Sequence, residues 1–285
     1  MSSLELLLIL LIVLGLSGAV PLAKVSVSNS VAEAFTAIYV SGIVFTMFVE
    51  QLIFIPLKHS FITFGHPVTT IILAGVISAF GYLSGYRGMK GVHAGISGTM
   101  FNLQGPLILL FGALLMTIYP EKTIIIGLVV SLVGIALIGS SKFKWRNISK
   151  GISFILVSLA PILWALAWVL FSTVSGEDPT FFTFLFFLTT FFVLLVIAIG
   201  RKAFLLVPRE AATYAFLGGT VAGVANASYG IFITSYGTAL TGIVTIIAVP
   251  VTVLLVIAVL HERYTFIEVL GMIVIGIGLV IALIF

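Results

Sequence analysis

Two stretches of this sequence carry the same landmarks 144 residues apart: GYRGMKGVHAGISGTMFNLQGPL (residues 85–107) and YGIFITSYGTALTGIVTIIAVPV (residues 229–251). In both stretches a glycine and a proline hold the same relative positions, Gly98 with Gly242 and Pro106 with Pro250. The same offset joins Gly75 to Gly219, Gly127 to Gly271 and Gly134 to Gly278. Similarity at one constant offset predicts two copies of a single structural unit.

The composition is that of a membrane protein. Of the 285 residues, 61% are hydrophobic and 8% are charged, and the mean hydropathy is +1.34. So few charges cannot cover a soluble surface, so the segments must face lipid or other buried helices. The apolar runs are long and continuous, as in residues 107–116 and 252–260, whereas a transmembrane β-barrel needs short alternating segments. We therefore expect an all-α membrane protein.

Three further features narrow the class of protein. The sequence has no Cys, which excludes disulfides and thiolate metal sites. Its net charge of +4 is too diffuse to indicate nucleic-acid binding. The first five residues carry an acid, Glu5, and no Lys or Arg, which favours a retained first helix over a cleaved signal peptide.

The apolar segments predict ten transmembrane helices, because a helix needs about 20 apolar residues to cross the hydrocarbon core. The expected spans lie near residues 4–23, 31–55, 68–86, 92–117, 123–139, 152–172, 181–199, 211–233, 238–260 and 266–285. A basic connector at residues 142–146 would join two five-helix halves, residues 1–141 and 149–285. Because five is odd, the halves would enter the membrane in opposite senses, as two inverted repeats.

The basic residues are distributed unevenly between the loops. Two, Lys58 and Lys122, fall in the loops after even-numbered spans. The other eleven fall in loops after odd-numbered spans: Lys24, Arg87, Lys90, Lys142, Lys144, Arg146, Lys150, Arg201, Lys202, Arg209 and Arg263. The positive-inside rule then predicts that these loops are cytoplasmic and that both termini lie outside.

The two quoted stretches resemble an element of the drug/metabolite transporter superfamily. In its EamA-like members a span ends in Tyr or Phe, turns briefly and continues through small residues to a mid-helix Pro. The stretch HERYTFIEVLGMIVIGIGLVIA (residues 261–282) is similar to that family's Glu-Arg turn and Gly-spaced last helix. The motifs cover spans three to five and eight to ten. The first copy departs from the pattern, with Ile118 in the place of Glu262 and Glu121 three residues later. Cytoplasmic termini, typical of that family, also differ from the charge-based orientation.

Polar side chains inside the fourth span are candidates for a binding site. A polar or charged group near the bilayer centre costs about 2–3 kcal/mol or more, so each needs a structural or functional reason. Thr99, Asn102 and Gln104 precede Pro106, which removes a backbone donor and frees a carbonyl. They either line a substrate pocket or hydrogen-bond between helices. Pro106 and Pro250 are the expected helix breaks.

Other spans supply further substrate-binding candidates. Asn226 and Tyr229 share one helical stripe that would face Tyr82, and Thr245 precedes Pro250 as Asn102 precedes Pro106. Threonines also pack helices together, and the mid-span indoles of Trp164 and Trp168 either stack on a solute or fill the bundle. The complete set of expected binding residues is Ser17, Tyr82, Thr99, Asn102, Gln104, Trp164, Trp168, Asn226, Tyr229 and Thr245.

Glu50 and His93 are the titratable side chains that could couple transport to protons at depth, although each is also close enough to a span end to reach the interface. The seventh span is rich in Phe, including Phe187 and Phe192, and we expect these side chains to face lipid.

The sequence therefore predicts a secondary transporter of small organic metabolites such as amino acids, and the family resemblance implies that it is an exporter. It would work by alternating access around a central cavity in the cytoplasmic membrane, as a monomer or homodimer. Its expected partners are a small-molecule solute and the lipid bilayer, with no nucleic acid, cofactor, metal or enzymatic activity. The alternatives are a multidrug/proton antiporter, and a non-transporting scaffold or lipid-handling protein whose polar residues only join helices.

Overall fold

The computed structural model describes residues 3–54, 66–115, 122–142, 148–174 and 178–284. Within these ranges the secondary structure is helical and contains no strand, so the expected all-α class is confirmed. The elements are α1 (Ser3–Ser28), α2 (Ala32–Phe54), α3 (His66–Met89), α4 (Ala94–Phe101), α5 (Gln104–Leu115), α6 (Lys122–Lys142), α7 (Ile148–Ser172), α8 (Pro179–Gly200), η2 (Ala203–Leu206), α9 (Arg209–Leu260) and α10 (Phe266–Ile284).

Seven helical segments among the described residues are long and apolar enough to cross a membrane, which makes the chain a multi-pass membrane protein. They are Ser3–Ser28, Ala32–Ile53, Pro67–Met89, Ala94–Leu115, Gly151–Ser172, Pro179–Gly200 and Arg209–Gly237. The sequence predicts ten spans. Over the remaining three predicted spans, the described residues hold shorter apolar helices, Ile125–Ile135, Ile247–Leu260 and Phe266–Gly278.

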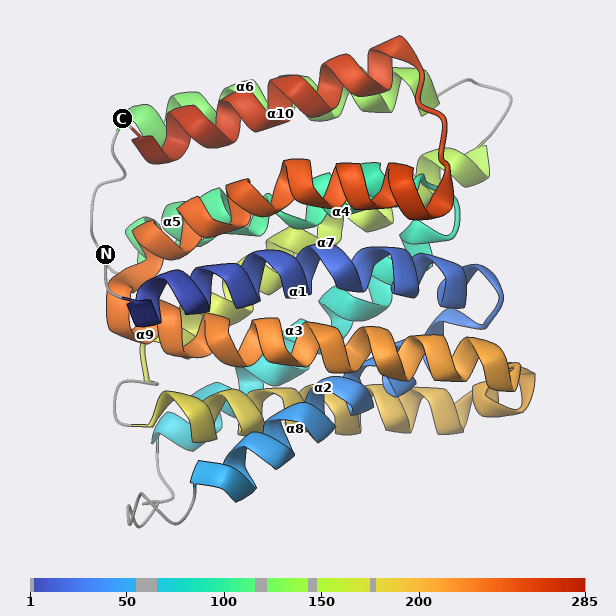
Figure 1. The fold of residues 1–285 in the computed structure, drawn as a ribbon, viewed down its shortest axis with the longest axis vertical. Coiled ribbons are helices and arrows are strands. Elements are labelled where there is room, and N and C mark those ends of the chain that lie inside the picture. Colours follow the sequence, from blue (N-terminus) through green and yellow to red (C-terminus); the bar gives the residue numbers. More distant parts are fainter. Residues whose placement is uncertain (1–2, 55–65, 116–121, 143–147, 175–177, 285) are drawn as a thin grey trace.

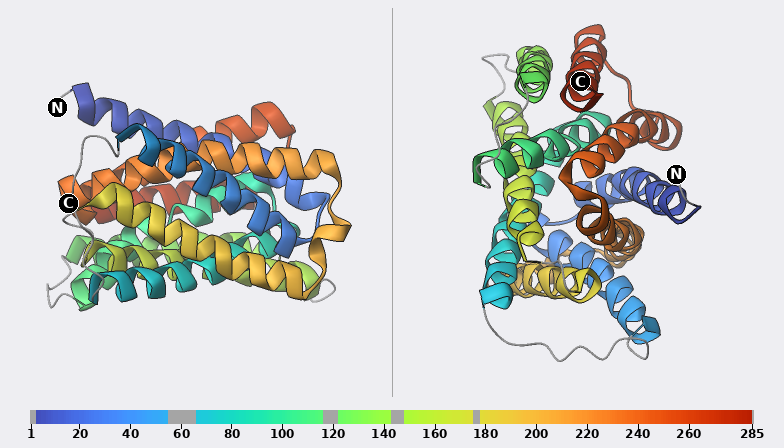
Figure 2. Two further views of the ribbon diagram at one scale, coloured as in Figure 1. Left: turned by 90° about the horizontal axis from the view of Figure 1, so that it is seen from below. Right: turned by 90° about the vertical axis from the view of Figure 1, so that its left-hand side faces the viewer.

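The long helices run roughly side by side, and the marked N- and C-termini lie at the same end of the bundle (Figures 1 and 2). We call the other end, which contains the turns at residues 29–31, 90–93, 201–208 and 261–265, the basic end. Arg87, Lys90, Arg201, Lys202 and Arg263 lie there. Lys24, expected in a loop, instead lies within the last turns of α1.

Two interruptions shape the helices that follow α3. The predicted span at residues 92–117 is divided into α4 and α5, because the N–H groups of Leu103 and Gly105 bond three residues back, to Met100 and Asn102. Pro106, which has no N–H, follows at once. α9 is interrupted at Gly237, whose backbone (φ 81°, ψ 173°) is one that essentially only glycine adopts. The chain reverses direction there (Figure 1), giving α9 two arms, residues 209–236 and 238–260.

Small residues bring α6 and α10 together in a pair at one side of the bundle (Figure 1). A Cβ atom on Gly134 would lie 2.7 Å from the carbonyl oxygen of Gly271, and one on Gly278 would lie 2.5 Å from that of Gly127. The contacts are reciprocal, because Gly271 and Gly278 are the 144-residue counterparts of Gly127 and Gly134. Between them the hydroxyl of Ser131 is 3.5 Å from the carbonyl oxygen of Ile275, its own counterpart.

The same reciprocity occurs where α2 and α8 pack against α9 and α3. The hydroxyl of Thr46 on α2 donates to the carbonyl of Thr220 on α9 at 3.1 Å. The hydroxyl of Thr190 on α8, 144 residues after Thr46, donates to the carbonyl of Gly75 on α3 at 3.0 Å. At the 144-residue offset α2 corresponds to α8, and α3 corresponds to the first arm of α9. The α2–α9 contact and the α8–α3 contact are therefore equivalent.

Candidate functional site

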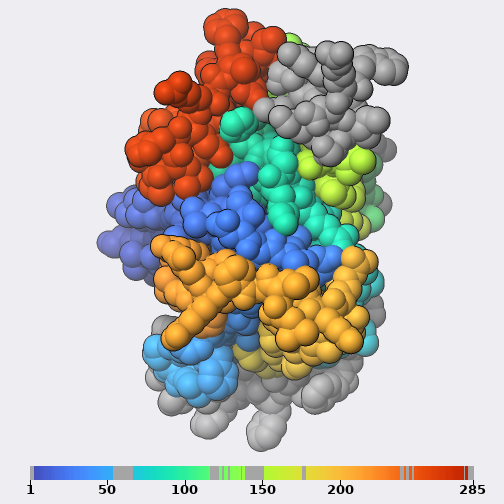
Figure 3. Space-filling view, turned by 90° about the vertical axis from the view of Figure 1, so that its right-hand side faces the viewer, coloured from blue at the N-terminus to red at the C-terminus, as the bar shows by residue number. Residues whose placement is uncertain are grey.

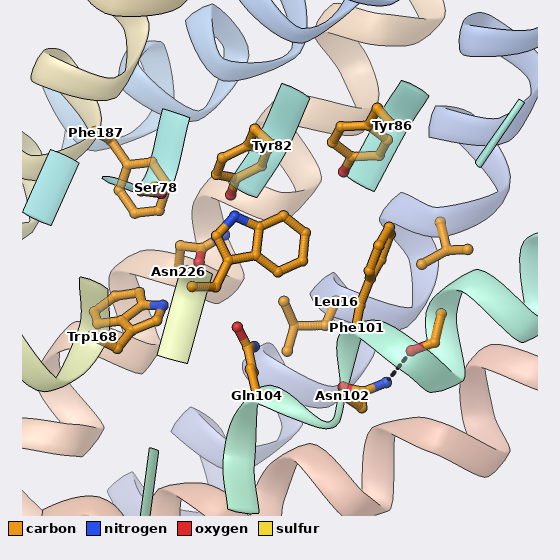
Figure 4. A pocket seen from close by; sticks show the side chains of 13 residues that line it. Leu16, Ser78, Tyr82, Tyr86, Phe101, Asn102, Gln104, Trp168, Phe187 and Asn226 are labelled. Atoms are coloured by element: carbon orange, nitrogen blue, oxygen red, sulfur yellow. Dashed lines mark hydrogen bonds between the residues drawn. The ribbon is translucent and has the colours of Figure 1, made fainter. Parts of the chain in front are cut away.

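A cavity of about 70 Å³ lies inside the bundle (Figure 4). A buried water needs roughly 10–15 Å³, so this space holds a few waters or part of a small solute. Helices α1, α3, α4, α5, α7, α8 and the first arm of α9 contribute to it. The lining residues are Leu16, Val20, Ser78, Tyr82, Tyr86, Gly98, Phe101, Asn102, Gln104, Trp164, Trp168, Phe187 and Asn226.

Aromatic rings form much of the cavity wall. Tyr82, Tyr86, Phe101 and Trp164 make a closed circuit of neighbours, with centroid distances of 6.0, 5.9, 5.0 and 5.0 Å around it. Two of these contacts, made by Phe101 with Tyr86 and with Trp164, are edge-to-face, which is a favourable geometry for aromatic pairs. Mutual contact fixes the four rings around one side of the cavity.

Two lining amides are held by their own helices. The Nδ2 of Asn102 donates to the carbonyl oxygen of Gly98 at 2.9 Å, and the Nδ2 of Asn226 donates to that of Ala222 at 2.8 Å. Turning either amide over would place its oxygen against a carbonyl oxygen, so the hydrogen-bond network fixes the orientation. Figure 4 shows Asn102, Asn226 and Gln104 around the same space as Tyr82 and Tyr86.

Six of the expected binding residues line this cavity, namely Tyr82, Asn102, Gln104, Trp164, Trp168 and Asn226. Four others lie outside its lining. The hydroxyl of Ser17 donates to Ala248 and accepts from Thr252, which joins α1 to the second arm of α9. Thr99 bonds back to Gly95, and Thr245 is buried in the second arm of α9. The ring of Tyr229 packs behind the wall against Trp168, with centroids 4.8 Å apart.

The expected hinge and coupling residues take different places. Pro106 is buried just after the α4–α5 break, whereas Pro250 lies within the second arm of α9 and is exposed at its surface. Glu50 is half-buried near the end of α2 and does not line the cavity. His93 is the residue before α4 at the basic end, where its Nδ1 lies 3.7 Å from a carboxylate oxygen of Glu262.

Phe187 is a lining residue that the sequence places on a lipid-facing helix. Phe182, Phe186 and Phe187 are all buried, so the expectation of lipid-facing bulk is wrong for this face of α8, although Phe192 is 53% exposed. The helix is strongly apolar overall, but Thr183 and Thr190 lie one turn before and after Phe187 and are buried, so these two threonines are the sequence signal that marks this face. Tyr86, Phe101 and Ser78 were likewise missed, although Ser78 and Tyr86 lie one helical turn either side of Tyr82.

Charged side chains join the helices at the basic end, which Figure 3 views directly. The buried carboxylate of Glu33 on α2 pairs with Arg87 on α3 and, at 2.9 Å, with Arg201 after α8. The ammonium of Lys24 donates to the carbonyls of Met89 and Val92, at 2.6 Å each. Lys90 donates to Ser30 at 2.8 Å. These bonds link α1, α2, α3 and α8 at the basic end.

Glu262 adds a further link in the turn between α9 and α10. Its carboxylate accepts from the N–H of Ala94 at 2.9 Å and from the hydroxyl of Tyr264 at 2.7 Å. Burial raises the pKa of this carboxyl group, but His93, the Ala94 N–H and the Tyr264 hydroxyl outweigh burial and lower the pKa to about 2. The negative charge sits at the N-terminus of α4, where the helix dipole favours it.

The described residues contain no group of three or more His, Cys, Asp or Glu side chains that could hold a metal ion.

Comparison with known proteins identifies the fold. No family model and no curated protein matches the sequence. A protein known from a crystal structure has the same fold at a TM-score of 0.64, covering 98% of this chain and 96% of that chain at 18% sequence identity. The apolar helices make the chain a multi-pass helical membrane protein, and another protein shares its fold over 98% of its length.

Proposed function

We propose that this protein is a secondary transporter of small organic metabolites that works by alternating access. The observation that carries the proposal is the cavity enclosed by helices from both halves of the chain. Leu16 to Gln104 come from the first half, and Trp164 to Asn226 come from the second. A site between two halves changes its access when one half moves against the other.

The reciprocal contacts support an inverted repeat of two five-helix units, residues 1–141 and 149–285. A two-fold axis makes residue i of one unit contact residue j of the other while j contacts i. Gly134 with Gly271 and Gly127 with Gly278 follow this pattern at the 144-residue offset. Ten spans follow if α4 and α5 together make one span, the two arms of α9 make two, and α6 and α10 make one each.

This reading agrees with the resemblance of the sequence to EamA-like drug/metabolite transporters. The two stretches related by the 144-residue offset map onto the α3–α4–α5 segment and onto α9, and each contains a break between two helical segments. The resemblance suggests export of amino acids or related metabolites across the cytoplasmic membrane. The shared fold at 18% identity supports the architecture alone.

The charge distribution supports an orientation in which the basic end is cytoplasmic and both termini are outside. In that orientation the Glu33, Lys24 and Lys90 links close the cytoplasmic side of the bundle. Transport would then require these links to break as the two halves move.

Exchange assays test the proposal directly. Purified protein in liposomes loaded with a wide panel of unlabelled metabolites should accumulate at least one labelled counterpart by counterflow, in excess of protein-free liposomes. Absence of exchange for every solute would overturn the transport proposal and favour a scaffold or lipid-handling role. A reporter fused after Phe285 tests the orientation, because cytoplasmic activity there would contradict outside termini.

A further inference from the structure

The connection between α8 and α9, residues 201–209, places exposed apolar side chains at the basic end. Its short helix η2 is anchored by Ala203, which is 1% exposed. The next three residues are exposed instead, Phe204 by 36%, Leu205 by 83% and Leu206 by 65%. Figure 3 shows this connection at the surface of the basic end. Contiguous exposed apolar side chains mark a site of interaction with a membrane or with another protein.

The position of η2 relative to the end of α8 favours the membrane. α8 has 22 residues, and a helix of that length rises about 33 Å, slightly more than the thickness of the hydrocarbon core. The left-handed backbone of Lys202 (φ 52°) follows the end of α8 at Gly200, so the chain leaves the helix axis there. Because η2 begins directly after this turn, its side chains reach the membrane at the level of the headgroups and the upper acyl chains.

Positive charge borders the apolar residues on both sides. Arg201 and Lys202 precede η2, Arg209 follows it, and all three residues are exposed. The side chain of Arg201 pairs with Glu33 and is nevertheless 63% exposed. Glu210 follows Arg209 and offsets one of these charges, so the connection keeps a net positive charge. Basic side chains next to exposed apolar ones match a lipid that has acyl chains and a negatively charged headgroup.

We infer that this connection binds an anionic phospholipid. The apolar side chains of η2 contact the acyl chains, while Lys202 and Arg209 contact the headgroup. Phosphatidylcholine has the same acyl chains without a net negative charge, so the basic residues select the anionic lipid. The pattern is not shared by the first copy of the repeat, where Leu57 and Gly65 correspond to Arg201 and Arg209 at the 144-residue offset. The inference is independent of the proposed transport function.

Quenching of fluorescence by brominated lipids tests the inference. The natural sequence has no Cys, so Leu205→Cys in the full chain carries a single thiol-linked fluorophore. The vesicles contain phosphatidylcholine and phosphatidylglycerol in equal amounts, and one of the two lipids carries bromine on its acyl chains. Brominated phosphatidylglycerol should quench at least about twofold more strongly than brominated phosphatidylcholine, because the basic residues concentrate it near η2. High salt should reduce the difference, since salt screens exposed charges.

Two controls separate this site from the general attraction of a basic protein for anionic lipid. Lys202→Gln combined with Arg209→Gln should make the two brominated lipids quench equally. Lys122→Gln combined with Arg263→Gln removes two exposed positive charges from other parts of the chain and should preserve the difference. A fluorophore on Leu254→Cys, which is 67% exposed on the second arm of α9, should be quenched equally by both lipids.

Equal quenching at residue 205 in the otherwise natural sequence would overturn the inference and favour an acidic protein partner for this surface. A difference that survives the loss of Lys202 and Arg209 would also overturn it. Quenching by brominated phosphatidylcholine shows that residue 205 of that variant still contacts lipid, so misfolding does not imitate the expected result. A difference abolished by soluble glycerol phosphate would show recognition of a free phosphate, which likewise contradicts binding of a phospholipid.

Discussion

The carboxylate of Glu262 accepts a hydrogen bond of 2.9 Å from the backbone N–H of Ala94, which lies 168 residues earlier in the sequence. The bond connects the turn before the last helix to the first residue of α4, the helix that leads into the cavity. A Cβ atom on Gly95 would meet the hydroxyl of Tyr264, so the turn and the helix pack closely at this point. The α9–α10 turn thus fixes the start of α4.

Glu262→Gln should lower the stability of the folded protein by roughly 0.5–1 kcal/mol, the usual value for a charge at a helix N-terminus. The variant keeps an acceptor oxygen but loses the negative charge. Thermal unfolding of the detergent-solubilised protein at neutral pH should therefore begin at a lower temperature than in the wild type. An unchanged melting temperature would show that the charge does not stabilise this junction.

The same pair of proteins should show a specific pH dependence. Folding lowers the Glu262 pKa from 4.5 to about 2, so the carboxylate contributes stability that is fully present above about pH 4.5. That contribution is lost as the pH falls through the folded-state pKa of about 2. The difference in melting temperature between wild type and Glu262→Gln should shrink over this range. A difference that stays constant would contradict the assigned shift.

Much of the fold can be predicted from the sequence because lipid imposes long apolar helices and leaves few alternatives. The repeated Gly and Pro positions also indicate where helices touch or break, as at Gly134 and Gly271. The α4–α5 break is harder to place. It lies at residues 102–103 rather than at Pro106, because the hydrogen bonds that a proline disturbs belong to the preceding turn.

The sequence identifies candidate site residues where a polar side chain interrupts an apolar span. It does not directly identify site residues that are themselves apolar. Asn102 and Asn226 stand out in the sequence because an amide inside a span needs a partner. Ser17 has the same polar character, but its partners are the carbonyl of Ala248 and the hydroxyl of Thr252, so only packing separates it from the cavity residues. Phe187 is apolar like most of its helix, and the signal that marks its face is indirect, because Thr183 and Thr190 lie one turn before and after it and are both buried.

Two glycines of α10 provide a matched test of close helix packing. A Cβ on Gly278 would lie 2.5 Å from the carbonyl oxygen of Gly127, whereas a Cβ on Gly276 would meet no atom within 4 Å. Gly278→Ala should therefore destabilise the protein by about 1–3 kcal/mol through overpacking. Gly276→Ala should be neutral or slightly stabilising, because alanine favours the helix. Melting temperatures measured side by side check this, and equal effects would contradict the assigned α6–α10 contact.

Asn226→Ala and Ser17→Ala should separate cavity residues from packing residues. Asn226 lines the cavity, so its loss should weaken the apparent affinity for an exchanged solute about three- to tenfold, as expected for one lost hydrogen bond. Ser17→Ala removes a bond between α1 and α9, so it should lower the melting temperature and leave the affinity unchanged. Counterflow at graded solute concentrations measures the affinities. A larger affinity change in Ser17→Ala would mean that the binding site is misplaced.

Glu50→Gln tests proton coupling. Because Glu50 lies outside the cavity lining, we expect solute exchange by this variant to match the wild type at every pH tested. Efflux driven by an imposed pH gradient provides the measurement. Loss of gradient-driven efflux in a variant that still folds and exchanges solute would instead favour a multidrug/proton antiporter that uses this carboxylate.

Glu33→Gln should loosen the basic end of the bundle. Its carboxylate is buried and pairs with both Arg87 and Arg201, so removing the charge leaves two guanidinium groups without their shared partner. The natural sequence has no Cys, so a single Ser78→Cys substitution reports access to the cavity without any background thiol.

Inside-out vesicles expose the cytoplasmic face of the membrane, where we expect the basic end to lie. In these vesicles a membrane-impermeant thiol reagent should label the Ser78→Cys variant slowly. Adding Glu33→Gln should raise the labelling rate several-fold, because the links between α2, α3 and α8 no longer hold this end closed. The control is Glu210→Gln, which removes the same charge from an exposed position in the first turn of α9. If both variants label at the wild-type rate, the Glu33 pairs stabilise the fold without controlling access to the cavity.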